Sequence, residues 1–221
     1  MQNNMISIII PVYNEEKTIF RVLESVKEAF RDVEYEIVVV DDGSKDNTPV
    51  ICVAYKNIQY IRLPQNHGKG FALRIGFARA QGSFIAIQDA DLEYNPSVLR
   101  KLYNQAKENI VIYGKRGRKQ GYLLNRIGNI FLSWVCNILY RSRLSDIYTC
   151  YKIIPGKILR LLRLSADGFE IEAEITAKLL RAGVLIVEIP IIYSPRTFKD
   201  GKHIRARDGI KGIWTLIRNR F

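Results

Sequence analysis

Three acidic side chains at intervals of two residues are the strongest candidates for chemistry in this chain of 221 residues. Asp89, Asp91 and Glu93 follow an apolar run, Phe84–Gln88. If the segment is extended, side chains two residues apart point to the same side, so the three carboxylates would converge. Converging carboxylates repel one another unless a cation lies between them. Carboxylates, phosphate oxygens and water are the ligands that Mg²⁺ and Mn²⁺ prefer, so the spacing indicates a divalent metal site, with a solvated acidic loop as the alternative.

Two other acidic segments follow predicted strands nearer the N-terminus. The first is Pro11–Glu15, which contains Tyr13, and the second is Asp41–Ser44, which contains Asp42. In open α/β sheets, ligands bind beyond the carboxyl ends of the strands. Three acidic strand ends therefore predict one binding site, in which Asp41 is as readily a carboxylate that closes the turn as a ligand.

A glycine-rich turn carries a candidate cation for the same site. Lys69 stands between Gly68 and Gly70. Because glycine has no Cβ, such a turn would allow the backbone to come close to a phosphate group. The turn lacks the third glycine of a dinucleotide fingerprint, and the chain has no Walker A pattern. The two histidines, His67 and His203, have no metal-ligand spacing.

The apolar periodicity predicts a doubly wound α/β sheet that would position these groups. Near-continuous β-branched runs such as Ile6–Val12 are typical of strands buried on both faces of a parallel sheet. Spacings of three and four residues, as in Ile19–Phe30, indicate helices between the strands. The predicted strands are 6–12, 36–40, 58–63, 84–88, 110–113 and 185–193, and the other predicted helices are one that starts at 48, then 70–80, 96–107, 127–140, 169–182 and a last one around 210–217. No element is assigned to 141–164, and a single domain with two halves, 1–114 and 115–221, is expected.

The charge is the one extreme of the composition. Lysine and arginine number 34 against 22 acidic residues, which gives a net charge of +12 and a pI near 9.7. Such a charge favours anionic partners: nucleic acid, phosphorylated small molecules or an acidic membrane surface. No helix-turn-helix, RNP or zinc pattern occurs, so nucleic acid is not an expected partner. With no basic leader, no run of about 18 apolar residues and no paired cysteine motif, the chain is expected to be cytoplasmic.

Four ordered motifs resemble those of the family-2 inverting glycosyltransferases of the GT-A fold. They are Ile8–Glu16 (IIIPVYNEE), Val39–Asp46 (VVDDGSKD), Asn66–Gly70 (NHGKG) and Asp89–Tyr94 (DADLEY). Within that family the chain is most similar to the dolichyl- or polyprenyl-phosphate sugar synthases, and the likeness continues through 146–152, 168–174 and 188–196. It implies a GT-A fold, with a mostly parallel, Rossmann-like sheet and acceptor-side helices, in which 1–114 binds the nucleotide sugar and 115–221 binds the acceptor.

The resemblance also implies a donor site for a nucleotide-activated hexose, with UDP favoured over GDP by the form of the Asp89–Tyr94 motif. Mg²⁺ or Mn²⁺ would link the donor diphosphate to a DxD pair and offset the charge that develops on the leaving group. The implied residues are Pro11, Tyr13, Glu15 and Asp42 for the base and ribose, Lys69 for the diphosphate, and Asp89, Ala90, Asp91 and Glu93 for the motif that carries the metal.

Two classes of acceptor stay open at this stage. A polyprenyl or dolichyl phosphate is already ionised at neutral pH and needs cations more than a base, and the fork of an arginine matches phosphate geometry. The candidate cations are Arg116, Arg126 and Arg196, with Lys202 and Arg205 as further phosphate contacts. A saccharide or protein hydroxyl would instead need a carboxylate to take its proton, and Asp146 is the candidate for that base or for orienting the acceptor.

The predicted helix 127–140 has a broad apolar stripe, with basic residues before and after it. The stripe comprises Ile127, Ile130, Phe131, Trp134, Val135, Ile138 and Leu139, and Asn129, Ser133 and Asn137 lie opposite. An apolar helix between cations suits the surface of an anionic membrane, and the chain would then bind peripherally to the cytoplasmic face. The alternative is a helix whose apolar stripe packs on the sheet.

Overall fold

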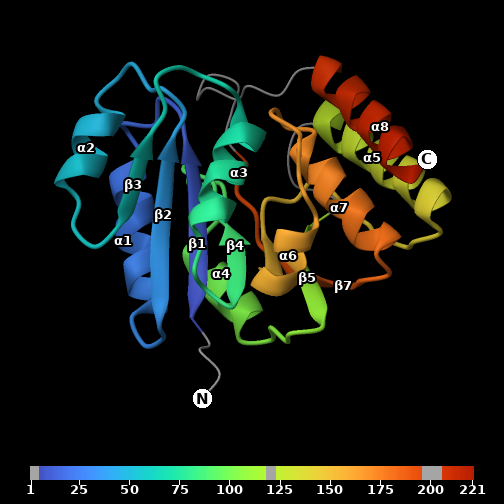
Figure 1. Ribbon diagram of the computed structural model, residues 1–221, viewed down its shortest axis with the longest axis horizontal. Helices are drawn as coiled ribbons and strands as arrows, with labels where there is room; N and C mark the ends of the chain where they lie inside the picture. Colours follow the sequence, from blue (N-terminus) through green and yellow to red (C-terminus); the bar gives the residue numbers. More distant parts are fainter. Residues whose placement is uncertain (1–4, 118–122, 196–205) are drawn as a thin grey trace.

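A seven-stranded mixed sheet forms the centre of the computed structural model, which describes residues 5–117, 123–195 and 206–221 (Figure 1). The strands are β1 (Ile6–Val12), β2 (Tyr35–Asp41), β3 (Gln59–Arg62), β4 (Phe84–Ile87), β5 (Ile110–Arg116), β6 (Lys152–Pro155) and β7 (Leu185–Ile191). Their order is β3-β2-β1-β4-β6-β5-β7, and β6 runs antiparallel to both neighbours while the other pairs are parallel. The predicted mostly parallel α/β sheet is confirmed.

Helices flank this sheet and gather beyond one of its edges. In the described residues they are α1 (Ile19–Phe30), α2 (Thr48–Ala54), α3 (Lys69–Arg79), α4 (Pro96–Tyr103), α5 (Leu123–Tyr140), α6 (Gly156–Leu161), α7 (Ile171–Arg181) and α8 (Ala206–Arg220). Helix α3 packs on β1 and β2, and α1 lies against α4. Helices α5 and α7 both contact α8, at the end of the molecule away from α2 (Figure 1).

The apolar runs form strands that are buried on both faces, as predicted. Ile8, Ile9 and Ile10 of β1 are fully buried, and so is the run 38–40 of β2. Helix α1 turns its predicted apolar face inward, with Ile19 and Phe30 at the two ends of that face. Each large aliphatic or aromatic side chain buried in this way contributes about 1.5–3 kcal/mol to stability. This core therefore fixes the strands whose ends carry the acidic segments.

The structure adds two elements where the sequence predicts none, β6 and α6. Strand β6 has only four residues and begins with Lys152, whose charge obscures the apolar strand pattern. The Lys152 ammonium is fully buried, donates to the Ile147 and Thr149 carbonyl oxygens and pairs with Glu172. A buried charge is stable only with such partners. One of those partners comes from α7, which the local sequence around β6 does not reveal.

The carboxyl ends of β1, β2 and β4 meet at one edge of the sheet. Strand β1 pairs in parallel with β2 as far as Val12 and Asp41, and with β4 as far as Ile9 and Ile87. Each of the three acidic segments lies at the end of one of these strands. The three segments are therefore at the same edge of the sheet, as the sequence predicts.

Candidate active site

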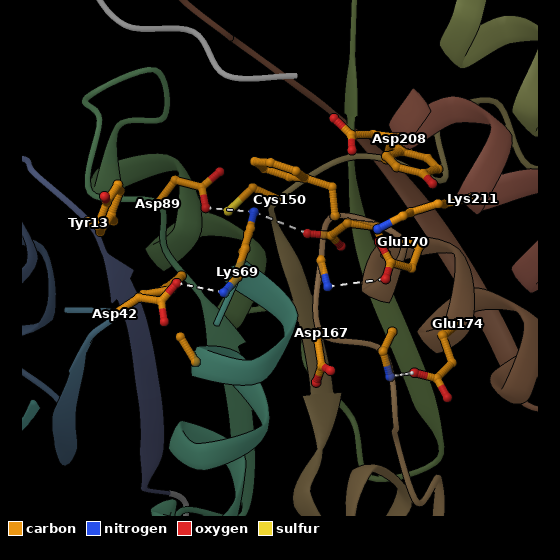
Figure 2. Close-up of a pocket in the computed structure, with 18 of the residues that line it drawn as sticks. Tyr13, Asp42, Lys69, Asp89, Cys150, Asp167, Glu170, Glu174, Asp208 and Lys211 are labelled. Carbon is orange, nitrogen blue, oxygen red and sulfur yellow. Dashed lines mark hydrogen bonds and ion pairs between the residues drawn. The ribbon is translucent and has the colours of Figure 1, made fainter. Parts of the chain in front are cut away.

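A cavity of about 1060 Å³ opens at these strand ends. One wall consists of the segments that follow β1, β2 and β4, and the other wall consists of residues 165–174 and of α8 (Figure 2). The cavity thus lies between the two halves of the chain. Of the site residues predicted from the sequence, those that line it are Pro11, Tyr13, Glu15, Asp42, Lys69, Asp89, Ala90, Asp91, Glu93 and Arg116.

The acidic motif after β4 is a turn, which corrects the expectation of an extended segment. Leu92 has a φ of 62°, and the Asp91 side chain accepts a hydrogen bond from the Glu93 N–H at 3.0 Å. The Glu93 carboxylate accepts a hydrogen bond from the Tyr193 hydroxyl, at the end of β7. The three carboxylates therefore do not converge as predicted, and no group of three metal-ligating side chains occurs in the described parts of the chain. The hydrogen bond to Tyr193 sets the direction of the Glu93 side chain, in place of the alternating side-chain directions of an extended strand.

The two remaining carboxylates of the motif fit a divalent cation. Asp89 and Asp91 both line the cavity, and the Lys69 ammonium lies 2.8 Å from Asp89 Oδ1. The folded protein therefore already places one cation against Asp89. Mg²⁺ is usually held by one or two carboxylates together with water and substrate phosphates, so a pair of carboxylates beside open space suits it. Asp89 and Asp91 are the residues that would hold the metal.

Lys69 belongs to a row of alternating charges that the sequence does not predict. Its ammonium lies between Asp89 and Glu172, 3.2 Å from Glu172 Oε1, and Figure 2 shows it reaching Asp89. Glu172 pairs through its other oxygen with Lys152. Burial alone would lower the pKa of Lys69, but the Asp89 and Glu172 carboxylates raise the pKa well above its usual range. We call Asp89, Lys69, Glu172 and Lys152 the charge row.

Glu172 is the site residue that sequence reasoning missed. It lies in the segment Gly168–Glu174, which belongs to the family resemblance, but it received no role. Glu172 is almost fully buried and lines the cavity in the first turn of α7. The available signal was a pair of acidic residues, Glu172 and Glu174, among apolar residues at the start of a helix, because an acid on a buried helix face requires a partner.

The glycine turn around Lys69 serves contact between two backbone segments. A Cβ on Gly70 would lie 2.5 Å from the Ala166 carbonyl oxygen, and one on Gly68 would lie 2.5 Å from the Asp167 carbonyl oxygen. These glycines admit residues 166–168 of the opposite wall, and the expectation that the turn also lets the backbone approach a phosphate stays a prediction. The Phe71 N–H donates to the Asp167 carbonyl oxygen at 3.0 Å, so the two walls are also hydrogen-bonded here.

Asp42 holds the same turn from the other side. Its two oxygens accept hydrogen bonds from the His67 and Gly68 N–H groups, each at 2.8 Å. Burial raises the pKa of Asp42, and the two backbone hydrogen bonds oppose that shift. Asp42 therefore positions the residues before Lys69 and also lines the cavity.

Asp41 closes a turn, as the alternative interpretation from the sequence had it. Its side chain is fully buried and accepts hydrogen bonds from the Ser44 N–H at 2.8 Å and the Tyr60 hydroxyl at 2.7 Å. Asp41 is not among the residues that line the described cavity. Its expected part in donor binding is therefore corrected, because it lies at the last position of β2 with its side chain directed into the core.

Arg116 and Asp146, whose side chains are 21% and 4% exposed, form an ion pair in the second half of the chain. Arg116 Nε lies 2.7 Å from Asp146 Oδ2 and Arg116 Nη2 lies 2.8 Å from Asp146 Oδ1, while Asn129 also donates to Oδ1. Burial would raise the pKa of Asp146, but the hydrogen bonds and the charge of Arg116 hold the pKa below its usual value. Arg116 lines the cavity and Asp146 does not, so Asp146 fixes the arginine from behind.

The other predicted cations are placed differently. Arg126 is half-buried near the start of α5. Within the described parts of the chain its Nε has no hydrogen-bond partner, and it is not among the cavity-lining residues. Arg196, Lys202 and Arg205 lie outside the described residues. In their place, α8 brings Arg207, Lys211 and Arg218 to the cavity, which the sequence did not predict.

Two carboxylates, the buried Glu174 and the half-buried Glu188, hold two loops in the second half of the chain. Glu174 accepts hydrogen bonds from the Ser165 and Ala166 N–H groups at 2.8–3.0 Å, and Glu188 accepts them from Ser145 and Asp146 at 2.8–2.9 Å. Burial would raise the pKa of Glu174, but Lys178 and these backbone donors lower it. Both loops are thus tied to rigid elements, Glu174 on α7 and Glu188 on β7.

Helix α5 turns its polar side inward and its apolar stripe outward. Asn129 donates to Asp146, the Ser133 hydroxyl accepts from the Ile147 N–H, and Asn137 donates to the Leu144 carbonyl oxygen. Ile127, Ile130, Phe131, Trp134 and Ile138 are 49–58% exposed. The alternative in which this stripe packs on the sheet is therefore wrong. No helix in the described parts of the chain is long and apolar enough to cross a bilayer.

The arrangement of the strands and helices matches a known class of fold. Glucosyl-3-phosphoglycerate synthase from Mycobacterium tuberculosis, solved with Mn²⁺, UDP and phosphoglyceric acid, superposes with a TM-score of 0.75 at 19% identity. The match covers 98% of this chain and 78% of that chain. The expected GT-A fold is confirmed. The family model described as glycosyl transferase family 2 matches residues 7–157, and the chain belongs to that family.

Curated relatives share this membership. The low-salt glycan biosynthesis hexosyltransferase Agl6 of Haloferax volcanii is 30% identical over 217 residues, which cover 90% of this chain and 52% of the relative. The undecaprenyl-phosphate 4-deoxy-4-formamido-L-arabinose transferase of Proteus mirabilis is 35% identical over 124 residues, which cover 53% of this chain and 38% of the relative. The chain thus spans about half or less of the length of these two relatives.

Proposed function

We propose that the chain is an inverting hexosyltransferase that moves a sugar from a UDP- or GDP-sugar to a polyprenyl or dolichyl phosphate. The observation that carries the proposal is that one cavity is lined by Asp89, Asp91 and Lys69 and also by Arg116. The relative from Proteus mirabilis, by name an undecaprenyl-phosphate transferase, supports this class of acceptor.

The residues of the donor side would divide the binding of the nucleotide sugar. Pro11, Tyr13 and Glu15 line the cavity next to β1, where the base and ribose would lie. Asp89 and Asp91 would hold Mg²⁺ or Mn²⁺, which offsets the charge that develops on the diphosphate leaving group. Lys69, which touches Asp89 in the structure, would add a second positive charge at the same place.

A phosphate acceptor suits the surroundings of Arg116 better than a hydroxyl does. An acceptor phosphate is already an oxyanion, so it needs orientation and a positive charge but no base. Arg116 is held at the cavity wall by two hydrogen bonds to Asp146 and by a third to the Tyr148 carbonyl oxygen. The oxygens of Asp146 are occupied and its pKa is lowered, which makes it a poor general base.

A donor and acceptor panel tests the proposal. Incubation with UDP- and GDP-hexoses, Mn²⁺ and a short-chain polyprenyl phosphate should release nucleotide with a preferred donor, and only when the phosphate acceptor is present. Equal turnover with the corresponding prenyl alcohol or with a saccharide would favour a hydroxyl acceptor instead. If UDP and GDP both give no heat in calorimetry with Mn²⁺, the proposed donor class is wrong.

We further propose that the exposed apolar side chains of α5 and α8 lie on an anionic membrane. Ile210 and Trp214 on α8 are exposed, as is Phe221 directly after it, and α8 contacts α5. The segment 206–221 contains four basic residues and one acidic residue, so its charge complements anionic lipid. Trp214 also lines the cavity, so a lipid acceptor would reach the site from the same surface.

The double substitution Phe131→Glu and Trp134→Glu should weaken binding to anionic vesicles by about tenfold or more, because each aromatic side chain buried in lipid contributes about 1.5–3 kcal/mol. Vesicle flotation at moderate salt, with and without phosphatidylserine, measures the effect. Val53→Glu is the matched control, because Val53 is an exposed apolar residue on α2, far from α5 (Figure 1). A wild-type protein that does not float, or a variant that instead loses self-association, contradicts the proposal.

A further inference from the structure

We infer that Lys69 is an internal cation that competes with the divalent metal for Asp89 and turns to the donor diphosphate when metal and nucleotide bind together. The inference rests on the proposed function, because it concerns the same donor site. On this inference, the charge row couples the binding of the metal to the binding of the nucleotide.

The geometry of the charge row places Lys69 where it can change partners. Its ammonium lies 2.8 Å from Asp89 Oδ1 and 3.2 Å from Glu172 Oε1, and the side chain is 15% exposed. Lys152 is fully buried and fixes Glu172 from the opposite side. Lys69 can therefore leave Asp89 and keep Glu172, whereas Lys152 has no open space to move into.

The backbone around Lys69 is fixed, so only its side chain is free to move. Lys69 is the first residue of α3, and Asp42 holds the preceding two N–H groups. A Cβ on Gly68 or Gly70 would collide with the backbone of the opposite wall. This rigidity keeps the ammonium within reach of both Asp89 and the cavity in which a diphosphate would bind.

The charges of the row balance without any ligand, because it contains two carboxylates and two ammonium groups. A divalent cation that approaches Asp89 alone meets a like charge on Lys69, and two cations close to one carboxylate repel each other strongly. A nucleotide diphosphate brings the negative charge that Lys69 needs after it leaves Asp89. Metal should therefore bind weakly by itself and much more tightly in the presence of nucleotide.

The variant Lys69→Met tests the inference without any turnover. Mn²⁺ is titrated into nucleotide-free protein, and the electron paramagnetic resonance signal of free Mn²⁺ reports binding. We expect Lys69→Met to bind Mn²⁺ about tenfold or more tightly than the wild type, because a unit charge within a few ångströms of the ligand is removed. At saturating Mn²⁺ the same variant should bind UDP more weakly, so the two affinities change in opposite directions.

Two further variants serve as controls. Lys178→Met removes a cavity-lining lysine that pairs with Glu174 outside the charge row, and it should leave Mn²⁺ affinity within about twofold, because distant charges are screened. Lys69→Arg keeps the charge and should bind Mn²⁺ as weakly as the wild type. If Lys69→Met does not fold, as judged by its melting transition, Lys69→Gln replaces it in the same titration.

The outcomes separate the inference from the proposed function. If wild-type protein binds UDP with Mn²⁺ but Lys69→Met gains no Mn²⁺ affinity, the inference is wrong and the donor site stands. Equal gains in Lys69→Met and Lys178→Met would also overturn it, because the effect would then be one of net charge. If the wild type binds neither UDP nor GDP with Mn²⁺, the proposed function itself is wrong.

Discussion

Asp91→Ala is expected to remove Mn²⁺-dependent binding of UDP and to lower sugar transfer by about a thousandfold. The reason is that Asp91 would be one of two protein ligands to the metal. A Lewis acid at the leaving group stabilises the transition state by several kcal/mol, and each step of about 1.4 kcal/mol corresponds to a tenfold change in rate. Isothermal titration with UDP, in the presence and absence of Mn²⁺, measures the first effect. Nucleotide release in the transfer assay measures the second, and raising the Mn²⁺ concentration should not restore it.

Glu93→Gln is the matched control for this prediction, because it changes the third acid of the same motif. Glutamine can still accept the hydrogen bond that the Tyr193 hydroxyl donates to Glu93. We therefore expect Glu93→Gln to retain Mn²⁺-dependent UDP binding within about threefold, as for other exchanges that keep a hydrogen bond. A loss as large as that of Asp91→Ala would show that Glu93 does bind the metal, and that the turn rearranges on binding.

Arg116→Met is expected to lower the free energy of unfolding by about 3–5 kcal/mol, since removing one partner of a buried ion pair leaves an uncompensated buried charge. The Asp146 side chain is only 4% exposed, and Arg116 supplies two of its side-chain hydrogen bonds. Urea unfolding at pH 7 measures the loss. The double variant Arg116→Met with Asp146→Asn should recover part of it, because no carboxylate is then left without its counter-charge.

The same variant has a predictable dependence on pH. The pKa of Asp146 is held below its usual value in the folded protein, so the pair stabilises the fold above about pH 4, the ordinary pKa of an aspartate. That contribution is lost as the pH falls through the lowered pKa of the folded state. In Arg116→Met, burial without the counter-charge raises the pKa of Asp146, so the stability difference from wild type should be largest at neutral pH and shrink as the pH falls toward and below about pH 4. A difference independent of pH would contradict the assignment of the loss to this pair.

The variant Asp146→Asn distinguishes a positioning residue from a base. A general base contributes about 10²–10⁴-fold to a rate, so its removal would nearly abolish transfer. We expect Asp146→Asn to reduce transfer to polyprenyl phosphate by about tenfold only, through a looser Arg116, as for a lost hydrogen bond to a charged group. The pH profile above pH 6 should keep its shape.

The sequence alone determined the elements whose character is local. Mostly apolar runs predict strands β1, β2 and β4, because runs with so few polar side chains are typical of strands buried on both faces. The order of these strands in the chain then predicts that the segments Pro11–Glu15, Asp41–Ser44 and Asp89–Glu93 meet at one edge. That part of the site follows from periodicity, since the parallel pairing of such strands leaves few other arrangements.

Tertiary structure alone decided which acids face the cavity and which hold the protein together. Asp41 and Asp89 both lie at the ends of buried strands. Asp41 accepts hydrogen bonds from the Tyr60 hydroxyl and the Ser44 N–H, whereas Asp89 pairs with Lys69 from α3. The pattern around Lys152 gives no strand, because its charge is balanced by Glu172, twenty residues away. The polar side of α5 faces inward for the same reason: its partners are supplied by distant segments. A charge can be buried only where a remote part of the chain brings its partner, and no local pattern records where that partner will be.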